Sequence, residues 1–273
     1  MSSAAGAASF RRQGRLTAIR EQMAGRIEQL KSELESDAAA GQRRKQAARL
    51  RAATEREERC RKALVRLREL EIEREVRKPK GEAKDRKAVR ASTTDAEARV
   101  MKMPDGGFRP AYNVQVAGDP DSQVIVGVAV DTRGCDVGQL RPMLEQLQDR
   151  YGRTPSWYLA DGGFCRFADI EWAWANDTAA VIPAGHGRDG KNPYAPQPSD
   201  GPGVTVWREL MSGALGQRMY RVRSQLECLF AQMRQRDLRQ VLVRGSRNVR
   251  CVMLLHALAH NLLCGARLRA QAV

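Results

Sequence analysis

Two groups of residues in this 273-residue chain could do chemistry together. Asp161 follows the apolar segment 157–160 and stands directly before Gly162 and Gly163. Functional groups in α/β proteins collect at the carboxyl ends of strands, and two glycines allow the backbone to turn sharply beside such a group. The same three residues could also form an ordinary turn with no function.

The second group has the spacing of one helix face. Tyr220, Arg223, Glu227 and Arg234 fall on one side of an α-helix, because each residue advances the helix by about 100°. A carboxylate flanked by guanidinium groups suits a site that binds both a metal ion and phosphate. The alternative is an exposed helix with incidental pairs such as Arg223–Glu227.

The elements around these residues predict an α/β fold. Alternating and β-branched residues, with turn residues between them, predict a β-hairpin over 112–119 and 123–131. The order of the later segments predicts a mixed sheet flanked by helices. We expect helices over 136–152 and 167–177, short strands over 157–161 and 179–184, a loop over 185–203, and mainly helix from residue 206 with a break near Gly245.

The amino-terminal part predicts an antiparallel helical hairpin over 15–77. Leu16, Ile19, Met23 and Ile27 begin an apolar stripe with helical spacing, which the segment around Gly41 interrupts before a second stripe resumes. The opposite faces are rich in Arg and Glu. They are typical of a solvated coiled coil, and DNA-backbone contact or oligomerisation are the alternatives. The basic segment 78–92 is predicted to be a loop or linker.

Charge and cysteine content narrow the function classes. The net charge of +15 favours a polyanionic partner, most plausibly nucleic acid. No apolar run reaches the roughly 18 residues that indicate a membrane span, and the first residues lack the apolar stretch of a signal peptide. The six scattered cysteines contain no CxxC pair, which indicates reduced thiols and a cytoplasmic protein.

The residues of the second group resemble a known family. The pattern Tyr220-x2-Arg223-x3-Glu227-x6-Arg234 resembles the signature around the last carboxylate of bacterial insertion-sequence DDE transposases of the IS4-like group, which usually have Lys where this chain has Arg234. The ADGGF segment at Asp161 resembles the segment that holds the second Asp of that family. The likeness extends over most of the chain, through 92–116, 206–210, 241–250 and 256–263.

The resemblance implies an RNase H-like catalytic domain over 92–273, with residues 1–91 forming a basic helical hairpin and linker inserted in the catalytic fold. It implies that three carboxylates hold two divalent metal ions, Mg²⁺ by preference, for DNA cleavage and strand transfer. Asp161 and Glu227 match two of the metal ligands. Arg223 and Arg234 would contact DNA phosphate, and Tyr220 would help to position the strand.

One departure from the family bears on activity. In the family the first Asp lies on the first, central strand, shortly before a stretch similar to residues 5–12. In this chain the first acidic residue is Glu21, inside the predicted helical hairpin. We therefore expect a carboxy-terminal catalytic portion, truncated before its first central strand, incomplete and inactive by itself. We also expect unpaired edges on the strands over 112–119 or 157–161.

Other candidate residues are weaker. Asp131 is the better-placed substitute carboxylate, ahead of Asp119 and Asp105, but none is favoured. The pair His256 and His260 has a spacing that can bind zinc, although core histidines are the more common case. The tryptophans at 172, 174 and 207 are more typical of packing than of base stacking, and His186 lies in the predicted loop.

Three functions remain open from the sequence. The first is transposition of an insertion element. The second is a non-catalytic fragment that binds DNA or pairs with an intact transposase, as a homo-oligomer does, and so inhibits it. The third is a decayed reading frame with no selected role.

Overall fold

The computed structural model describes residues 1–35, 40–76, 88–103, 105–185, 192–236, 238 and 240–271, with the backbone alone at residues 40 and 41. These residues form two compact units. The first comprises Met1, Asn113–Gln240 and Val249–Val273, and the second comprises Ser2–Tyr112 and Val241–Asn248. The division of the chain that the composition predicts at residue 91 stays a prediction.

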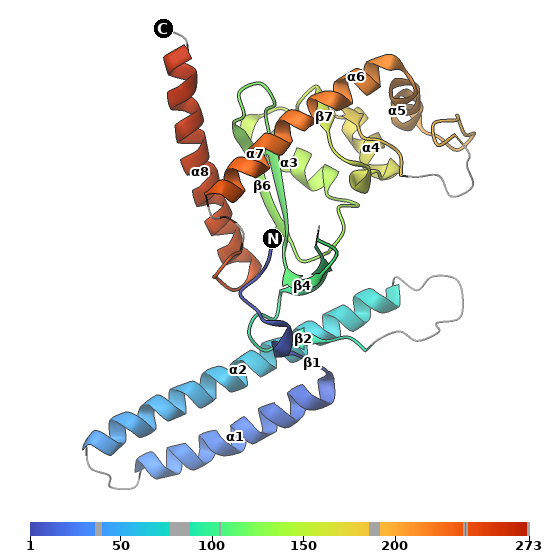
Figure 1. The fold of residues 1–273 in the computed structure, drawn as a ribbon. Helices are drawn as coiled ribbons and strands as arrows, with labels where there is room; N and C mark the ends of the chain where they lie inside the picture. Colours follow the sequence, from blue (N-terminus) through green and yellow to red (C-terminus); the bar gives the residue numbers. More distant parts are fainter. Residues whose placement is uncertain are drawn as a thin grey trace. The chain divides into compact units, whose positions relative to one another are not determined.

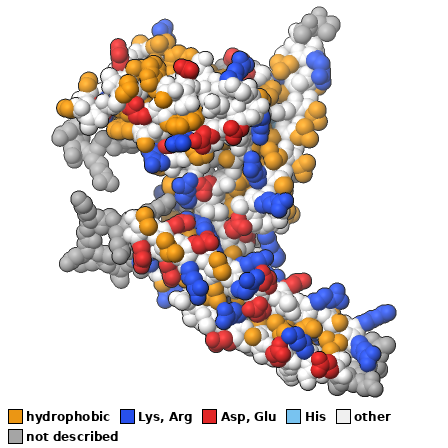
Figure 2. Space-filling view, turned by 180° about the vertical axis from the view of Figure 1, so that it is seen from behind, with side chains coloured by type: hydrophobic (Ala, Val, Ile, Leu, Met, Phe, Trp, Pro, Cys, Tyr) orange, Lys and Arg blue, Asp and Glu red, His pale blue; other side chains and the backbone are white. Residues whose placement is uncertain are grey.

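The second unit is built on two long helices, α1 (Gln13–Glu35) and α2 (Ala40–Val76), which pack against each other (Figure 1). The apolar stripes form the contact, and Leu16, Ala63 and Leu67 are fully buried in one cluster. Figure 2 shows Lys and Arg side chains interspersed with Asp and Glu along the outer surface of this hairpin. The predicted pair of helices is therefore present in the structure.

Short ladders complete the second unit. After the 3-10 helix η1 (Ala7–Ser9), strand β1 (Phe10–Arg11) pairs with β2 (Ala91–Ser92), and β3 (Arg99–Lys102) pairs with β4 (Phe108–Ala111). Neither ladder was predicted. Most of the predicted linker 78–92 lies outside the described residues, and its last part enters β2.

The first unit contains two strand pairs. Strands β5 (Asn113–Gly118) and β6 (Ile125–Asp131) form the predicted antiparallel hairpin, and β7 (Trp157–Leu159) pairs in parallel with β8 (Ala179–Val181). The expectation of one mixed sheet is wrong for the described residues, because no hydrogen bonds join the two pairs into a single sheet. In the part of the chain that the structure describes, β5 and β7 each have one strand neighbour.

Helices cover the strands β7 and β8 and bury the main core. Leu144, Ile170, Val181 and Trp207 lie in one buried cluster, and the Trp207 Nε1–H donates to the backbone oxygen of Ile182. The helices of this unit are α3 (Leu140–Tyr151), α4 (Phe167–Trp174), α5 (Pro202–Ser212), α6 (Ala214–Val222), α7 (Ser224–Gln235) and most of α8 (Ser246–Gln271), with the 3-10 helix η2 (Gly162–Phe164) between β7 and α4.

Local chemistry fixes the ends of two of these helices. Helix α3 ends at Gly152, whose φ of 71° is the left-handed conformation that glycine adopts without strain. Helix α5 begins with Pro202, and the Glu171 carboxylate accepts hydrogen bonds from the Gly203 and Val204 backbone at 2.9 and 2.8 Å. The side chain of α4 thereby holds the start of α5.

The carboxy-terminal helix is more apolar than the sequence analysis expected. Helix α8 is long and apolar enough to cross a membrane, with a mean hydropathy of 1.4 over 18 residues, of which 28% are buried. One such helix is weak evidence for a span, and α8 holds the β-hairpin through Asn261, which bonds to both backbone groups of Ile125. Figure 2 shows hydrophobic side chains exposed along α8.

A buried ion pair makes the stability of the first unit dependent on pH. Arg208 and Asp200 are joined at 2.7 Å, and both side chains are at least 95% buried. The hydrogen bond from Arg208 lowers the pKa of the Asp200 carboxyl. The pair therefore stabilises the fold above the unfolded-state pKa of about 4, and this contribution is lost as pH falls through the lower folded-state pKa.

We expect Asp200→Asn to be less stable than the unchanged protein at pH 7, with the difference shrinking as pH falls below about 4. Urea unfolding followed by tryptophan fluorescence between pH 7 and pH 3 measures it. The control Asp149→Asn removes an exposed carboxylate on α3 and should follow the unchanged protein. A stability difference for Asp200→Asn that is constant with pH would contradict this role.

Candidate functional site

Asp161 stands at the carboxyl end of β7, where the chain turns into η2. It is the N-cap residue of η2, and its side chain accepts a hydrogen bond from the Gly163 N–H at 2.9 Å. A Cβ atom at position 163 would lie only 2.9 Å from Asp161 Oδ1. Glycine at 163 therefore gives the carboxylate room to fold back over the turn, so the tripeptide is a turn that also positions an exposed acid.

Arg223 joins Asp161 to Glu227. Its Nη2 lies 3.6 Å from Asp161 Oδ2, and its Nη1 lies 3.3 Å from Glu227 Oε1. The carboxylates come from β7 and α7, and one cationic group contacts both. The side chains are 45% exposed at Asp161 and 68% exposed at Glu227, so solvent screens these pairs and they contribute little to stability.

The signature residues divide between two helices. Tyr220 lies in α6 and Glu227 in α7, and Arg223 is the junction between them, with helical φ and ψ of −55° and −29°. The expectation of one uninterrupted helix is therefore wrong at this residue, although its helical backbone lets α6 and α7 run on from one another (Figure 1). The Arg223 guanidinium lies 5.9 Å from the centre of the Tyr220 ring.

Arg234 lies apart from this group. It stands in the last turn of α7 and is exposed. No contact among the described residues joins it to Asp161 or Glu227. The structure thus brings together Tyr220, Arg223, Glu227 and Asp161, and leaves Arg234 further along the same helix.

A third carboxylate reaches the same cavity, and the sequence analysis missed it. Asp136 lines a cavity of about 230 Å³ together with Asp161, Arg223 and Glu227. Its Oδ1 accepts hydrogen bonds from Asn113 at 2.8 Å and Gln115 at 2.6 Å. The ideal Cβ position at Gly163 is 3.3 Å from Asp136 Oδ2, so Asp136 and Asp161 approach the same point.

A signal for Asp136 was present in the sequence. It follows the β-branched strand β6 and precedes α3, which is the same strand-to-helix position that singled out Asp161. The intervening residues 132–135 hid the resemblance, since no acid directly ends the strand except Asp131.

The substitute carboxylates weighed in the sequence lie elsewhere. Asp131 is held by Arg133 and Gln139. Burial alone would raise the pKa of the Asp131 carboxyl, but hydrogen bonds from Arg133 and Gln139 lower it below its ordinary value. Asp119 accepts bonds from Ser122 in the hairpin turn, and Asp105 pairs with Arg109. None of the three lines the cavity of Asp161.

The histidine pair is not a metal site among the described residues. His260 is buried, with Nδ1 3.1 Å from an Arg236 guanidinium nitrogen and Nε2 2.7 Å from the Gln123 backbone oxygen. Because Arg can only donate, Nδ1 accepts and Nε2 carries the proton. The ring is therefore a satisfied core group. His186 lies outside the described residues.

The tryptophans pack rather than stand free for bases. Trp207 is buried in the core, and Arg141 stacks over Trp172 at 5.2 Å. Trp174 is 41% exposed and lines a small cavity with Gly203 and Trp207.

The donor set tests the fit of a divalent metal. Carboxylate oxygens are the ligands that Mg²⁺ prefers, and Asp161 and Glu227 supply them beside Arg223. Across residues 1–35, 40–76, 88–103, 105–185, 192–236, 238 and 240–271, no three His, Cys, Asp or Glu side chains converge closely enough to hold a metal ion. The site therefore has suitable ligands but is incomplete in this arrangement.

Comparison with known proteins gives one match. The family model described as a transposase DDE domain matches residues 77–262. No curated protein sequence matches the chain significantly, and no solved structure does so. The matched range covers more than half of the chain and contains Asp161, Arg223 and Glu227. The chain therefore belongs to the family of transposases with a DDE domain.

Proposed function

We propose that this protein takes part in DNA transposition as an insertion-sequence DDE transposase of the IS4-like group. The observation that carries the proposal is the convergence of Asp161 and Glu227 on the Arg223 guanidinium in one cavity. Two acids beside a cationic group are the chemistry that metal-dependent phosphodiester cleavage needs. The substrate is DNA at the ends of the element, and the place of action is the cytoplasm.

The order of the elements supports an RNase H-like catalytic domain over 92–273, with 1–91 as an inserted helical region. The antiparallel hairpin β5–β6 is followed by α3, β7, α4 and β8, and the acids lie at the carboxyl end of β7 and on α7. The edges of β5 and β7 face a gap, which agrees with the absence of a central strand between them.

The cofactor we propose is Mg²⁺, bound by Asp161 and Glu227. A bound divalent ion would activate the attacking hydroxyl and stabilise the leaving oxygen at the DNA phosphate. The residues of this chain have a simpler task. Asp161 and Glu227 present their oxygens to the cavity, and Asp136 lies close enough to contribute if its hydrogen bonds to Asn113 and Gln115 rearrange.

Arg223 couples DNA binding to cation binding in this proposal. Without DNA its guanidinium neutralises both carboxylates. A DNA phosphate competes for the guanidinium, because arginine binds phosphate through paired hydrogen bonds. Transfer of Arg223 to a phosphate frees the two carboxylates, so each ligand strengthens the binding of the other. Tyr220 supports the guanidinium from α6, and Arg234 adds a phosphate contact further along α7.

A second candidate function is favoured by the incomplete donor set. As the described residues do not complete a three-ligand site, the 273-residue chain by itself would bind DNA without cleaving it. Such a chain would compete with an active transposase for the element ends or pair with it. The basic helical hairpin is the surface we assign to that pairing.

We expect Asp161→Asn and Glu227→Gln each to weaken Mg²⁺ binding by about tenfold or more, because each removes a charged ligand. Isothermal titration calorimetry on the full chain measures the affinity. Glu145→Gln is the matched control, since Glu145 is also an exposed acid in an i,i+4 pair, with Arg141, and its affinity should be unchanged. Equal affinities for all three variants would exclude the carboxylate pair as the metal site.

We expect the chain to bind terminal-repeat DNA with an affinity that falls steeply with salt, and to leave that DNA uncut in Mg²⁺. Each phosphate contact contributes about 0.9 to the slope of log K against log salt. Arg223→Gln and Arg234→Gln should each reduce the slope by about that amount, measured by fluorescence anisotropy.

The control for the DNA experiment is Arg141→Gln, which removes the same charge from a residue that stacks on Trp172. Its slope should match that of the unchanged protein. A uniform reduction in all three variants would show a general charge effect rather than a site at α6 and α7. Mg²⁺-dependent cutting by the unmodified chain would show that its own residues complete the catalytic site.

A further inference from the structure

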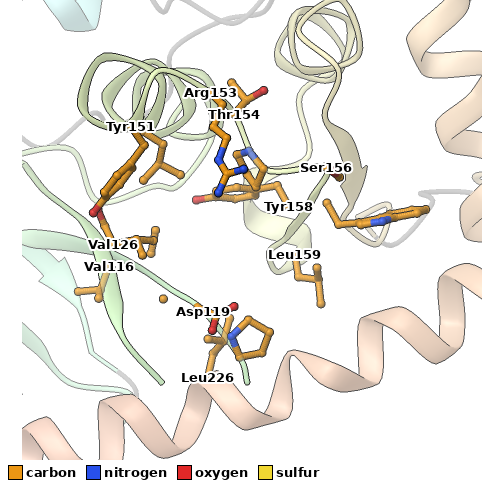
Figure 3. Close-up of a pocket in the computed structure, with 16 residues that line it drawn as sticks. Val116, Asp119, Val126, Tyr151, Arg153, Thr154, Ser156, Tyr158, Leu159 and Leu226 are labelled. Atoms are coloured by element: carbon orange, nitrogen blue, oxygen red, sulfur yellow. The ribbon is translucent and has the colours of Figure 1, made fainter. Parts of the chain in front are cut away.

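A continuous gap runs between β5 and β7 in the first unit. A cavity of about 800 Å³ is lined by Val116 of β5, Leu159 of β7, Leu147 of α3 and Leu226 of α7. Figure 3 shows Val116 and Leu159 on opposite sides of it, with Tyr151 and Leu226 at its other two limits. The smaller cavity that holds Asp161 shares Val116, Gly118, Tyr158, Leu159 and Leu226 with it.

The backbone of β5 directs hydrogen-bonding groups into this gap. Val128 of β6 is opposite Val116, and both backbone groups of Val128 bond to the Gln146 side chain, at 2.9 and 3.1 Å. Residues opposite each other in an antiparallel ladder either exchange both hydrogen bonds or exchange none. Val116 therefore points its N–H and C=O away from β6, and so does Val114, two residues earlier.

The backbone of β7 does the same from the other side. The Ser156 oxygen accepts from Ala179 at 2.9 Å, and the Ala160 N–H donates to Val181 at 3.3 Å. Backbone groups alternate in direction along a strand. Trp157 and Leu159 therefore point their N–H and C=O away from β8, toward the gap.

The other edge of the hairpin is protected. On the outer edge of β6, Gln146 covers Val128, Arg150 and Tyr151 bond to the Val126 oxygen, and Asn261 bonds to Ile125. Within the described part of the chain, no hydrogen bond reaches the gap-facing backbone groups of Val114, Val116, Trp157 or Leu159. An uncovered strand edge is a template for another strand, and here two such edges line one apolar space.

We propose that this gap binds an extended segment of a second polypeptide, which adds as a strand between β5 and β7. Strand addition satisfies the backbone groups on both sides, and neighbouring strands need only about 4.8 Å on each side. The bound segment is apolar on both faces, because Leu147 and Leu226 line the space and strands covered on both faces are continuous apolar runs.

The second polypeptide is required by the pairing of the strands already described. β1 pairs with β2, β3 with β4, β5 with β6 and β7 with β8, so the described residues contain no free strand to enter the gap. The inference does not depend on the metal site, since it uses backbone groups and apolar side chains alone.

The test uses a synthetic peptide with a Val-Ile-Val-Ala-Val centre flanked by lysines, added to the full chain. Hydrogen exchange should slow by about tenfold or more at the amides of Val114, Val116, Trp157 and Leu159, and stay unchanged at Val128. The same peptide methylated at alternate amide nitrogens cannot donate to one edge and should give no protection. Equal protection by both peptides, or none by either, would overturn the proposal.

A matched pair of variants tests the edge of β5. Val116→Pro removes an N–H that faces the gap, and Val128→Pro removes the opposite N–H on the protected edge. Val116→Pro should weaken peptide binding by about tenfold or more, and Val128→Pro should not. Equal binding by the two folded variants would contradict the assignment. If either variant is unfolded by circular dichroism, the methylated peptide decides.

The source of the strand is tested separately. Met1 belongs to the same unit as β5 and β7, so the five-residue centre can also be fused ahead of it. Protection of the four amides by free peptide at about 1 mM supports a strand from a second polypeptide. Protection by the fused strand alone would overturn that source in favour of a strand from the same chain.

Discussion

The contact of one guanidinium with two carboxylates is the interaction on which the functional interpretation depends. Arg223 lies 3.6 Å from Asp161 and 3.3 Å from Glu227. The acids lie on elements that are separated in the sequence by β8, α5 and α6. Their approach is possible without mutual repulsion because a positive charge lies between them. The same arrangement marks a place where a divalent ion or a phosphate can exchange with the guanidinium.

The sheet around this contact is open. The hairpin β5–β6 and the parallel pair β7–β8 are each complete by themselves, yet their facing edges keep unused donors and acceptors. The cavity of the two acids and the larger apolar cavity are continuous through Val116 and Leu159. Whatever fills the larger space therefore also limits the freedom of β7, which positions Asp161. Catalytic competence and completion of the sheet are linked through that strand.

Local sequence patterns predicted most of the elements. The stripe that begins at Leu16 predicted the helical hairpin, and the alternation around Val116 predicted β5. Both succeed because periodicity reports which side of an element is buried. The single mixed sheet was wrong, because pairing between distant strands depends on contacts that no local pattern contains. The break at Arg223 was missed because its backbone stays helical while only the hydrogen-bond pattern changes.

The site was partly predictable for the same reason. Asp161 was found because it directly follows an apolar strand and precedes two glycines. Asp136 was missed because four residues separate it from its strand, and only the fold of 132–139 brings it to the cavity. The exposed leucines of α8 were also missed, since an apolar stripe in a sequence gives no sign of whether another element covers it.

The central claim is that Asp161 and Glu227 can share one cation. The most direct test is a crystal of the Arg223→Gln variant soaked in Mn²⁺, a divalent ion that carboxylate sites of this kind bind. The account predicts one anomalous-scattering peak within bonding distance of carboxylate oxygens from both residues. A peak bound to only one of them, or none at this cavity while Mn²⁺ binds elsewhere, would contradict it.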